Sequence, residues 1–147
     1  MGNGAQGYAA RMWGITATEY IQKADPWPLN PDGELLLGLK IENLRAVANA
    51  DAVAAVPGIA FAEWGPGDMG MSLGLADAHD PPYPAEMLAA RAKVLAACKA
   101  NKLAFLEQVT PENVAAQIDA GVMVGAGKQA AAAAEIGRRH THRQEPW

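Results

Sequence analysis

The chain has 147 residues, of which half are apolar and 19% are charged, and its formal net charge is −4. This is the composition of a single water-soluble domain with its own core, and the negative balance argues against nucleic acid, which needs a basic face. Because no apolar run reaches 18 residues, we predict neither a membrane span nor a secretory signal.

The first 34 residues follow no regular hydrophobic pattern. They are rich in Gly, Trp and Pro, and we predict a loop-rich lead-in with one short helix at residues 18–23. The string Gly2 to Gly7 matches G-x-G-x-x-G, but no strand precedes it, which argues against a dinucleotide site. A structureless stretch of this length is unusual in a compact domain, so we expect it to be functional or part of something larger.

From Leu35 to Arg139, short apolar runs alternate with helical patterns. Four strand–helix units in succession are typical of a parallel sheet in an α/β fold, either doubly wound or part of a (β/α)8 barrel. Residues 140–147 are then a tail, which contains His140 and His142. The predicted strands are residues 35–41, 59–64, 103–109 and 122–125, and the predicted helices are a stretch from 44 to 55, 84–100, 110–121 and 128–139.

The helix that begins near Pro84 has the clearest pattern, with apolar residues recurring at steps of three and four. Before it, residues 65–84 are rich in Gly, Pro and Asp and are predicted to be a loop, and after it Asn101 is expected to be a left-handed stop. Cys98 lies on the apolar side of the helix, which predicts a packed thiol rather than a nucleophile. With no second cysteine for an intramolecular disulfide, a reducing cytoplasm is the expected compartment.

Two carboxylates follow neighbouring predicted strands. Glu42 comes directly after the first strand, and Asp68 follows the second in the string Gly65-Pro66-Gly67-Asp68. Ligands bind at the carboxyl ends of parallel strands, which lie about 4.8 Å apart, so these side chains can share one hard cation. The spacing alone leaves open a second interpretation, in which Glu42 is a helix N-terminal acid and Asp68 a turn former.

The strings around these carboxylates resemble the HpcH/HpaI aldolase family. They are Lys40-Ile41-Glu42 and, about twenty residues later, the run from Trp64 to Gly70. The family has Q-I-E at the first strand end and G-P-x-D-L at the next. The resemblance implies a TIM-barrel fold, with Glu42 and Asp68 as metal ligands and Gly67 as a backbone contact to substrate. Lys40 stands where the family has a glutamine that contacts substrate.

The resemblance also implies an activity. Members of the family are metal-dependent pyruvate-type aldolases, so we expect a carbon–carbon lyase that cleaves or forms 4-hydroxy-2-oxo acids, with pyruvate and an aldehyde as the other partners. The expected cofactor is a divalent metal, Mg²⁺, Mn²⁺ or Co²⁺, held by Glu42 and Asp68. The cation would act as a Lewis acid on the 2-oxo acid.

The four predicted strands correspond in order and spacing to strands five to eight of the family's barrel. The chain therefore resembles the C-terminal half of a TIM-type barrel. The family's proton-transfer histidine and carboxylate-binding arginine belong to the first four strands, so the resemblance assigns no catalytic base to this chain. Half a barrel has two open sheet edges, and we expect it to form a homo-oligomer or to pair with an N-terminal half-barrel.

Several alternatives remain open. The chain is either half of an active enzyme or a non-catalytic half-barrel that only assembles with another chain. His79 is a candidate substitute base or a solvated loop histidine, and His140 with His142 is a chance metal pair or part of a solvated tail. Gly127-Lys128 hints at a phosphate loop, but Val122 occupies the place of its first glycine.

Overall fold

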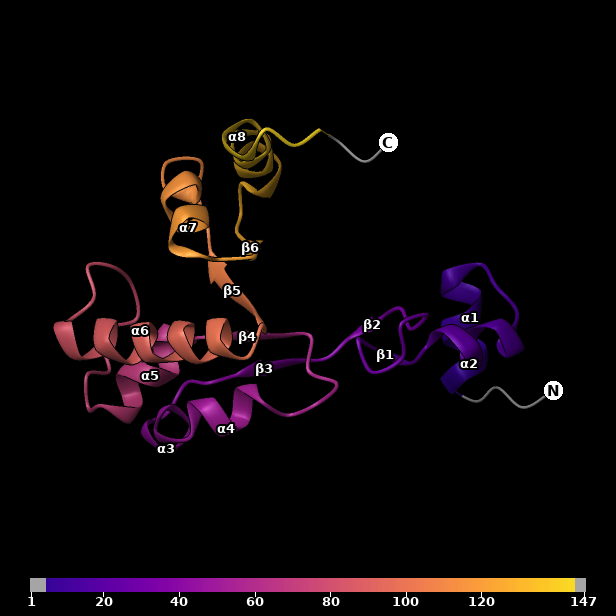
Figure 1. The fold of residues 1–147 in the computed structure, drawn as a ribbon, viewed down its shortest axis with the longest axis horizontal. Coiled ribbons are helices and arrows are strands. Elements are labelled where there is room, and N and C mark those ends of the chain that lie inside the picture. Colours follow the sequence, from indigo (N-terminus) through magenta and orange to yellow (C-terminus); the bar gives the residue numbers. More distant parts are fainter. Residues whose placement is uncertain (1–4, 145–147) are drawn as a thin grey trace.

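A four-stranded parallel sheet is the central feature of the computed structural model, which describes residues 5–144 (Figure 1). Each strand pairs with the next one along the chain. An all-parallel sheet whose order follows the sequence is built from successive β/α units, so the predicted α/β fold is confirmed. The strands are β3 (Gly38–Lys40), β4 (Phe61–Glu63), β5 (Ala104–Gln108) and β6 (Val124–Ala126).

Helices make every connection within this sheet. The first begins at the predicted cap, because Asn43 Oδ1 accepts a hydrogen bond of 2.9 Å from the backbone N–H of Ala46. None of the helices between residues 5 and 144 has both the length and the apolar character of a membrane span. The helices of the sheet region are α3 (Leu44–Ala48), α4 (Ala50–Ala54), α5 (Pro66–Ser72), α6 (Ala85–Ala100), α7 (Val114–Ala120) and α8 (Ala130–Thr141).

Two of the predicted connections are wrong in detail. The stretch that begins at Asn43 is not one helix, because Asn49 ends α3 and is the N-cap of α4. Residues 65–84 are not loop throughout, since they contain α5. Pro66 occupies the first turn of that helix, where its missing N–H has no intrahelical partner to lose.

The helix ends show a further correction. Asn101 caps α6 with φ −97°, so it is not left-handed, and its side-chain Nδ2 donates to the Ala97 carbonyl at 2.9 Å. The left-handed residue is instead Lys102, with φ 56°. The helix predicted at residues 110–121 ends at Gly121 as expected, in the left-handed region, but α7 begins only at Val114. The expected tail at 140–147 begins later than predicted, because α8 continues to Thr141, and residues 145–147 lie outside the described part of the chain.

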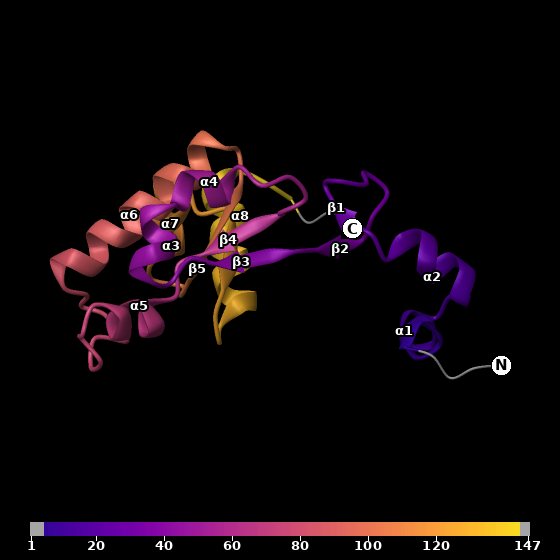
Figure 2. The ribbon, with the colours of Figure 1, turned by 90° about the horizontal axis from the view of Figure 1, so that it is seen from below.

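The hydrophobic core lies between one face of the sheet and the helices. Figure 2 shows α3, α4 and α6 on the same side of the strands. Successive strand residues point to opposite faces, so one set is buried against these helices and the other, which includes Phe61, Leu106 and Val124, is only partly covered. The side chains that are almost fully buried in the core are Ile41, Trp64, Phe105, Met87, Val94 and Cys98.

The N-terminal segment forms a separate arm that lies away from the four-stranded sheet (Figure 1). It contains α1 (Ala5–Trp13), α2 (Ala17–Lys23), and a two-stranded parallel sheet of β1 (Pro26–Trp27) and β2 (Leu35–Leu36). A capping box starts α2, in which the Glu19 N–H donates to Thr16 Oγ1 and the Thr16 N–H donates to Glu19 Oε2.

This arm differs from the prediction in two ways. The lead-in at 1–34 has a second helix, α1, and the glycine string from Gly2 to Gly7 lies partly outside the described residues and otherwise within that helix. The predicted strand at 35–41 is divided, because β2 pairs with β1 while β3 pairs with β4. Leu36 is therefore 64% exposed, although a continuous apolar run predicts a strand buried on both faces.

Candidate active site

Lys40, Glu42, Gly67 and Asp68 lie around one cleft at the carboxyl ends of β3 and β4. The cleft has a volume of about 450 Å³ and is also lined by Glu63. Glu42 is two residues beyond Lys40 and so lies on the same side of the sheet, and Asp68 is in the first turn of α5. The structure thus brings together the four residues that the sequence analysis selected.

The Glu42 carboxylate is held in an unusual environment. Its Oε2 atom is buried and has no hydrogen-bond partner, although buried polar atoms are nearly always paired. The oxygen reaches this position because Gly65 has no side chain: a Cβ on Gly65 would lie 2.2 Å from it. A buried carboxylate oxygen without a donor is costly, which is the environment expected of an atom that binds a cation.

Lys40 is the nearest cationic group to this oxygen. Its Nζ lies 3.7 Å from Glu42 Oε2 and 3.8 Å from Glu63 Oε2. Lys40 and Glu63 are direct partners across β3 and β4, so the sheet register sets the three side chains on one face. Glu63 was not among the predicted site residues, and its signal in the sequence is its position as the last residue but one of a predicted strand.

Asp68 and Gly67 face open space. Asp68 is exposed at the start of α5, and a Cβ built on Gly67 would meet nothing within 4 Å. Among residues 5–144, no three His, Cys, Asp or Glu side chains are grouped closely enough to hold a metal ion by themselves. A cation bound by Glu42 and Asp68 would need water or substrate oxygens to complete its coordination.

These residues nevertheless fit a divalent cation. Two carboxylates with no nitrogen or sulfur donor suit a hard, oxygen-preferring ion such as Mg²⁺ or Mn²⁺, which normally retains several waters. The unpartnered Glu42 oxygen and the glycine that makes room for it are both consistent with that use.

The three histidines give weaker support for a role as base or metal ligand. His79 lines the mouth of the cleft, where its Nδ1 lies 2.7 Å from Asp80 Oδ2, and its side chain is 63% exposed. His140 Nε2 lies 2.7 Å from Asp119 Oδ1, and His142 is the left-handed C-cap of α8. His140 therefore pairs with an acid on α7 rather than forming a metal pair with His142.

Cys98 is a packed residue, as predicted. It belongs to α6, and its side chain is fully buried in the core on the inner face of that helix. Burial raises the pKa of the Cys98 thiol to about 11, because the charged thiolate is disfavoured away from water. The thiol is therefore not an activated nucleophile.

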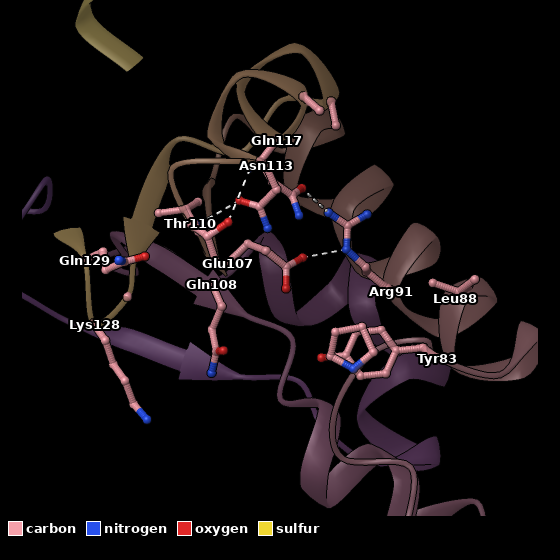
Figure 3. Close-up of a pocket in the computed structure, with 15 residues that line it drawn as sticks. Tyr83, Leu88, Arg91, Glu107, Gln108, Thr110, Asn113, Gln117, Lys128 and Gln129 are labelled. Carbon is pink, nitrogen blue, oxygen red and sulfur yellow. Dashed lines mark hydrogen bonds and ion pairs between the residues drawn. The ribbon is translucent and has the colours of Figure 1, made fainter. Parts of the chain in front are cut away.

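A second cavity, of about 900 Å³, lies beside β5 between α6 and α7 (Figure 3). Glu107, from β5, is only 7% exposed and accepts a hydrogen bond from Arg91 Nε. Arg91 Nη2 also donates to Gln117 Oε1 at 2.8 Å, and its guanidinium lies over the Phe105 ring. This network joins β5, α6 and α7.

Burial raises the pKa of the Glu107 carboxyl, and the hydrogen bond from Arg91 opposes that shift. This pair was not predicted. The only sign of it in the sequence is Arg91, a charged residue that falls in the apolar register of the helix pattern. Because both charges are buried together, we assign the pair a structural role.

Gly127 and Lys128 line the same cavity near the start of α8. A Cβ on Gly127 would lie 2.3 Å from the Val109 carbonyl oxygen, so close packing against β5 explains this glycine. β6 leads through a short loop into α8, but Val122 and Gln129 stand where a phosphate loop has its first glycine and its Ser or Thr, so the sequence of this loop argues against that interpretation.

Parallel strands with helical connections and acidic side chains at the strand ends define an α/β protein, an arrangement that is consistent with a TIM-like fold. A family model matches residues 11–134, and the chain belongs to the HpcH/HpaI aldolase/citrate lyase family. A search of the curated proteins finds no significant match.

Solved structures support the same fold. An HpcH/HpaI aldolase from Desulfitobacterium hafniense DCB-2 has a TM-score of 0.56 and 20% identity, covering 87% of this chain and 47% of its own. An HpcH/HpaI aldolase/citrate lyase family protein from Burkholderia cenocepacia J2315 has a TM-score of 0.57 and 22% identity, covering 86% and 48%.

The citrate lyase beta subunit from M. tuberculosis, complexed with oxaloacetate and magnesium, has a TM-score of 0.57 and 18% identity, covering 69% of this chain and 50% of its own. The chain thus spans about half the length of these structures.

Proposed function

We propose that the chain carries the metal-binding part of a carbon–carbon lyase that cleaves or forms 4-hydroxy-2-oxo acids, with pyruvate and an aldehyde as the other partners. The observation that carries the proposal is the buried, unpartnered Oε2 of Glu42 in a cleft shared with Asp68. Family membership supports lyase chemistry, and the magnesium and oxaloacetate bound by the citrate lyase beta subunit support a divalent cation and a small oxo acid.

In this proposal Glu42 and Asp68 hold Mg²⁺, Mn²⁺ or Co²⁺. When bound, the cation supplies Lewis-acid stabilisation of the negative charge that develops on the oxo-acid oxygen. The open backbone at Gly67 lets the substrate approach the start of α5 closely, because no side chain intervenes. Lys40 contributes the positive charge that attracts the substrate carboxylate.

We also propose that the four strands correspond to strands five to eight of the barrel. The partly covered face of the sheet, and the coverage of about half of each matched structure, support this assignment. A separate N-terminal half-barrel would then cover the face and supply the proton-transfer group, whereas another copy of this chain would cover the face only.

A non-catalytic half-barrel is the second candidate. It is favoured by the state of His79, the only histidine among the described residues of the cleft, which is largely exposed and pairs with Asp80.

The proposal is tested by the relaxation of pyruvate methyl protons in the presence of the 147-residue chain and Mn²⁺. Pyruvate bound beside a protein-held Mn²⁺ relaxes much faster than pyruvate with free Mn²⁺ at the same concentration. We expect this enhancement with the unaltered chain and its loss in Glu42→Gln and Asp68→Asn. Equal relaxation in all three proteins would overturn the proposal.

A further inference from the structure

The cleft contains a positive charge beside its proposed metal ligand. Among the described residues that line it, Lys40 is the only lysine or arginine. Its Nζ lies 3.7 Å from Glu42 Oε2, which is within ion-pair range but beyond hydrogen-bond range. The oxygen is therefore neutralised in part and still has no hydrogen-bond donor.

The position of the ammonium is set by a second carboxylate. Glu63 Oε2 lies 3.8 Å from Lys40 Nζ, and the two residues are direct partners in the β3–β4 register. Neighbouring side chains on one face of a sheet are held within contact distance by the backbone pairing. Lys40 is thus shared between Glu42, a proposed metal ligand, and Glu63. Among the described residues, Glu63 does not form a group of three metal-binding side chains with its neighbours.

We propose that Lys40 competes with the divalent cation for Glu42, and that Glu63 is the positioning residue that holds the Lys40 ammonium between the two carboxylates and so away from closer contact with Glu42. This inference rests on the proposed function. A dication and an ammonium near the same carboxylate oxygen repel each other, so the lysine weakens cation binding at this site. Glu63 attracts the ammonium from the neighbouring strand and so limits how close it comes to Glu42.

The test is the dissociation constant for Mn²⁺, measured from the free-ion signal in electron paramagnetic resonance, on the full 147-residue chain. Lys40→Gln should bind Mn²⁺ roughly three- to tenfold more tightly than the unaltered chain, given the modest strength of partly exposed ion pairs. Lys93→Gln, which removes the same charge from an exposed position in α6, should bind as the unaltered chain does.

Glu63→Gln should weaken Mn²⁺ binding, because the ammonium is then attracted by Glu42 alone. A double-mutant cycle separates this from a simple loss of negative charge. If Glu63 acts through Lys40, its substitution has little effect in the Lys40→Gln background. An effect of Glu63→Gln that persists unchanged in that background would overturn the positioning role.

The outcomes also separate this inference from the proposed function. Unchanged or weaker Mn²⁺ binding by Lys40→Gln, with binding that still depends on Glu42, would overturn the competition alone. Mn²⁺ binding that is the same in Glu42→Gln as in the unaltered chain would overturn the metal site itself. Circular dichroism of each variant confirms that the fold is retained, since Lys40 is exposed and Glu63 lies at a strand end.

Discussion

Gly65 makes room for Glu42: a Cβ on this glycine would lie 2.2 Å from the buried Oε2 of the carboxylate. The backbone of Gly65, with φ −91° and ψ 103°, is in a region that any residue adopts. The Glu42 side chain therefore uses the space that this glycine leaves at the carboxyl ends of β3 and β4, while the backbone conformation of Gly65 does not itself call for glycine.

Replacing this glycine should displace the ligand. We expect Gly65→Ala to weaken Mn²⁺ binding at least roughly tenfold, because the added methyl group takes the space of Glu42 Oε2. The measurement is a Mn²⁺ titration of the purified variant. Gly67→Ala is the matched control, since its Cβ would meet nothing within 4 Å and alanine favours the helix that contains it. Equal loss in both variants would contradict the role of the Gly65–Glu42 contact.

The Arg91–Glu107 pair gives a prediction for stability. Arg91→Met leaves the Glu107 carboxylate buried without a partner, and we expect a loss of about 3–5 kcal/mol in the free energy of unfolding by urea at pH 8. Arg91→Met combined with Glu107→Leu should recover most of that loss, because it removes the unpaired charge as well.

The stability lost in the single variant Arg91→Met should depend on pH. Burial raises the pKa of Glu107 above its ordinary value of 4.5, so the folded state binds its proton more tightly than the unfolded state. The stabilisation from that proton is complete below the unfolded pKa and is lost as pH rises through the folded pKa. Without Arg91 the folded pKa rises further, so the loss in Arg91→Met should be smaller at pH 5 than at pH 8. An equal loss at both pH values would contradict this.

Cys98 should be unreactive until the protein unfolds. Its side chain is fully buried and its pKa is raised to about 11, so little thiolate is present or accessible at pH 8. We expect labelling by a thiol reagent to be roughly a hundredfold slower in the native protein than in concentrated urea. The rate is followed by absorbance of the released reagent, and native labelling at the urea rate would show that the thiol is accessible.

The open sheet predicts association. Among the described strands β3 pairs only with β4 and β6 only with β5, and the face that carries Leu106 is partly uncovered. Light scattering after size exclusion should give a mass of at least two chains. Leu106→Lys, which places a charge on the open face, should shift that mass towards one chain. A monomer before the substitution would contradict the half-barrel assignment.

Hydrophobic periodicity was enough to predict the alternation of strands and helices from Gly38 onward, because the buried face of each element repeats with its own period. It did not predict α1 or the separation of β2 from β3. The separation depends on pairing between residues 26–27 and 35–36, and a continuous apolar run contains no information on which partner a strand takes.

The candidate site was predictable in part. Glu42 and Asp68 follow neighbouring strands, so the rule for strand ends and the resemblance of their flanking strings brought them together. Glu63 was missed because its distance to Lys40 depends on the register of β3 and β4, and register is a tertiary property. Arg91 and Glu107 were missed for a related reason, since neither strand nor helix pattern shows that two buried charges meet.

The central claim, that Glu42 and Asp68 bind a divalent cation, is tested most directly by the dissociation constant for Mn²⁺ of the 147-residue chain. Glu42→Gln and Asp68→Asn should each weaken binding at least roughly tenfold, because a neutral amide is a much poorer ligand for a hard cation. Glu86→Gln, which removes an acid from the first turn of α6, should leave the constant unchanged. If all four proteins bind Mn²⁺ equally, or if the unaltered chain binds none, the account is contradicted.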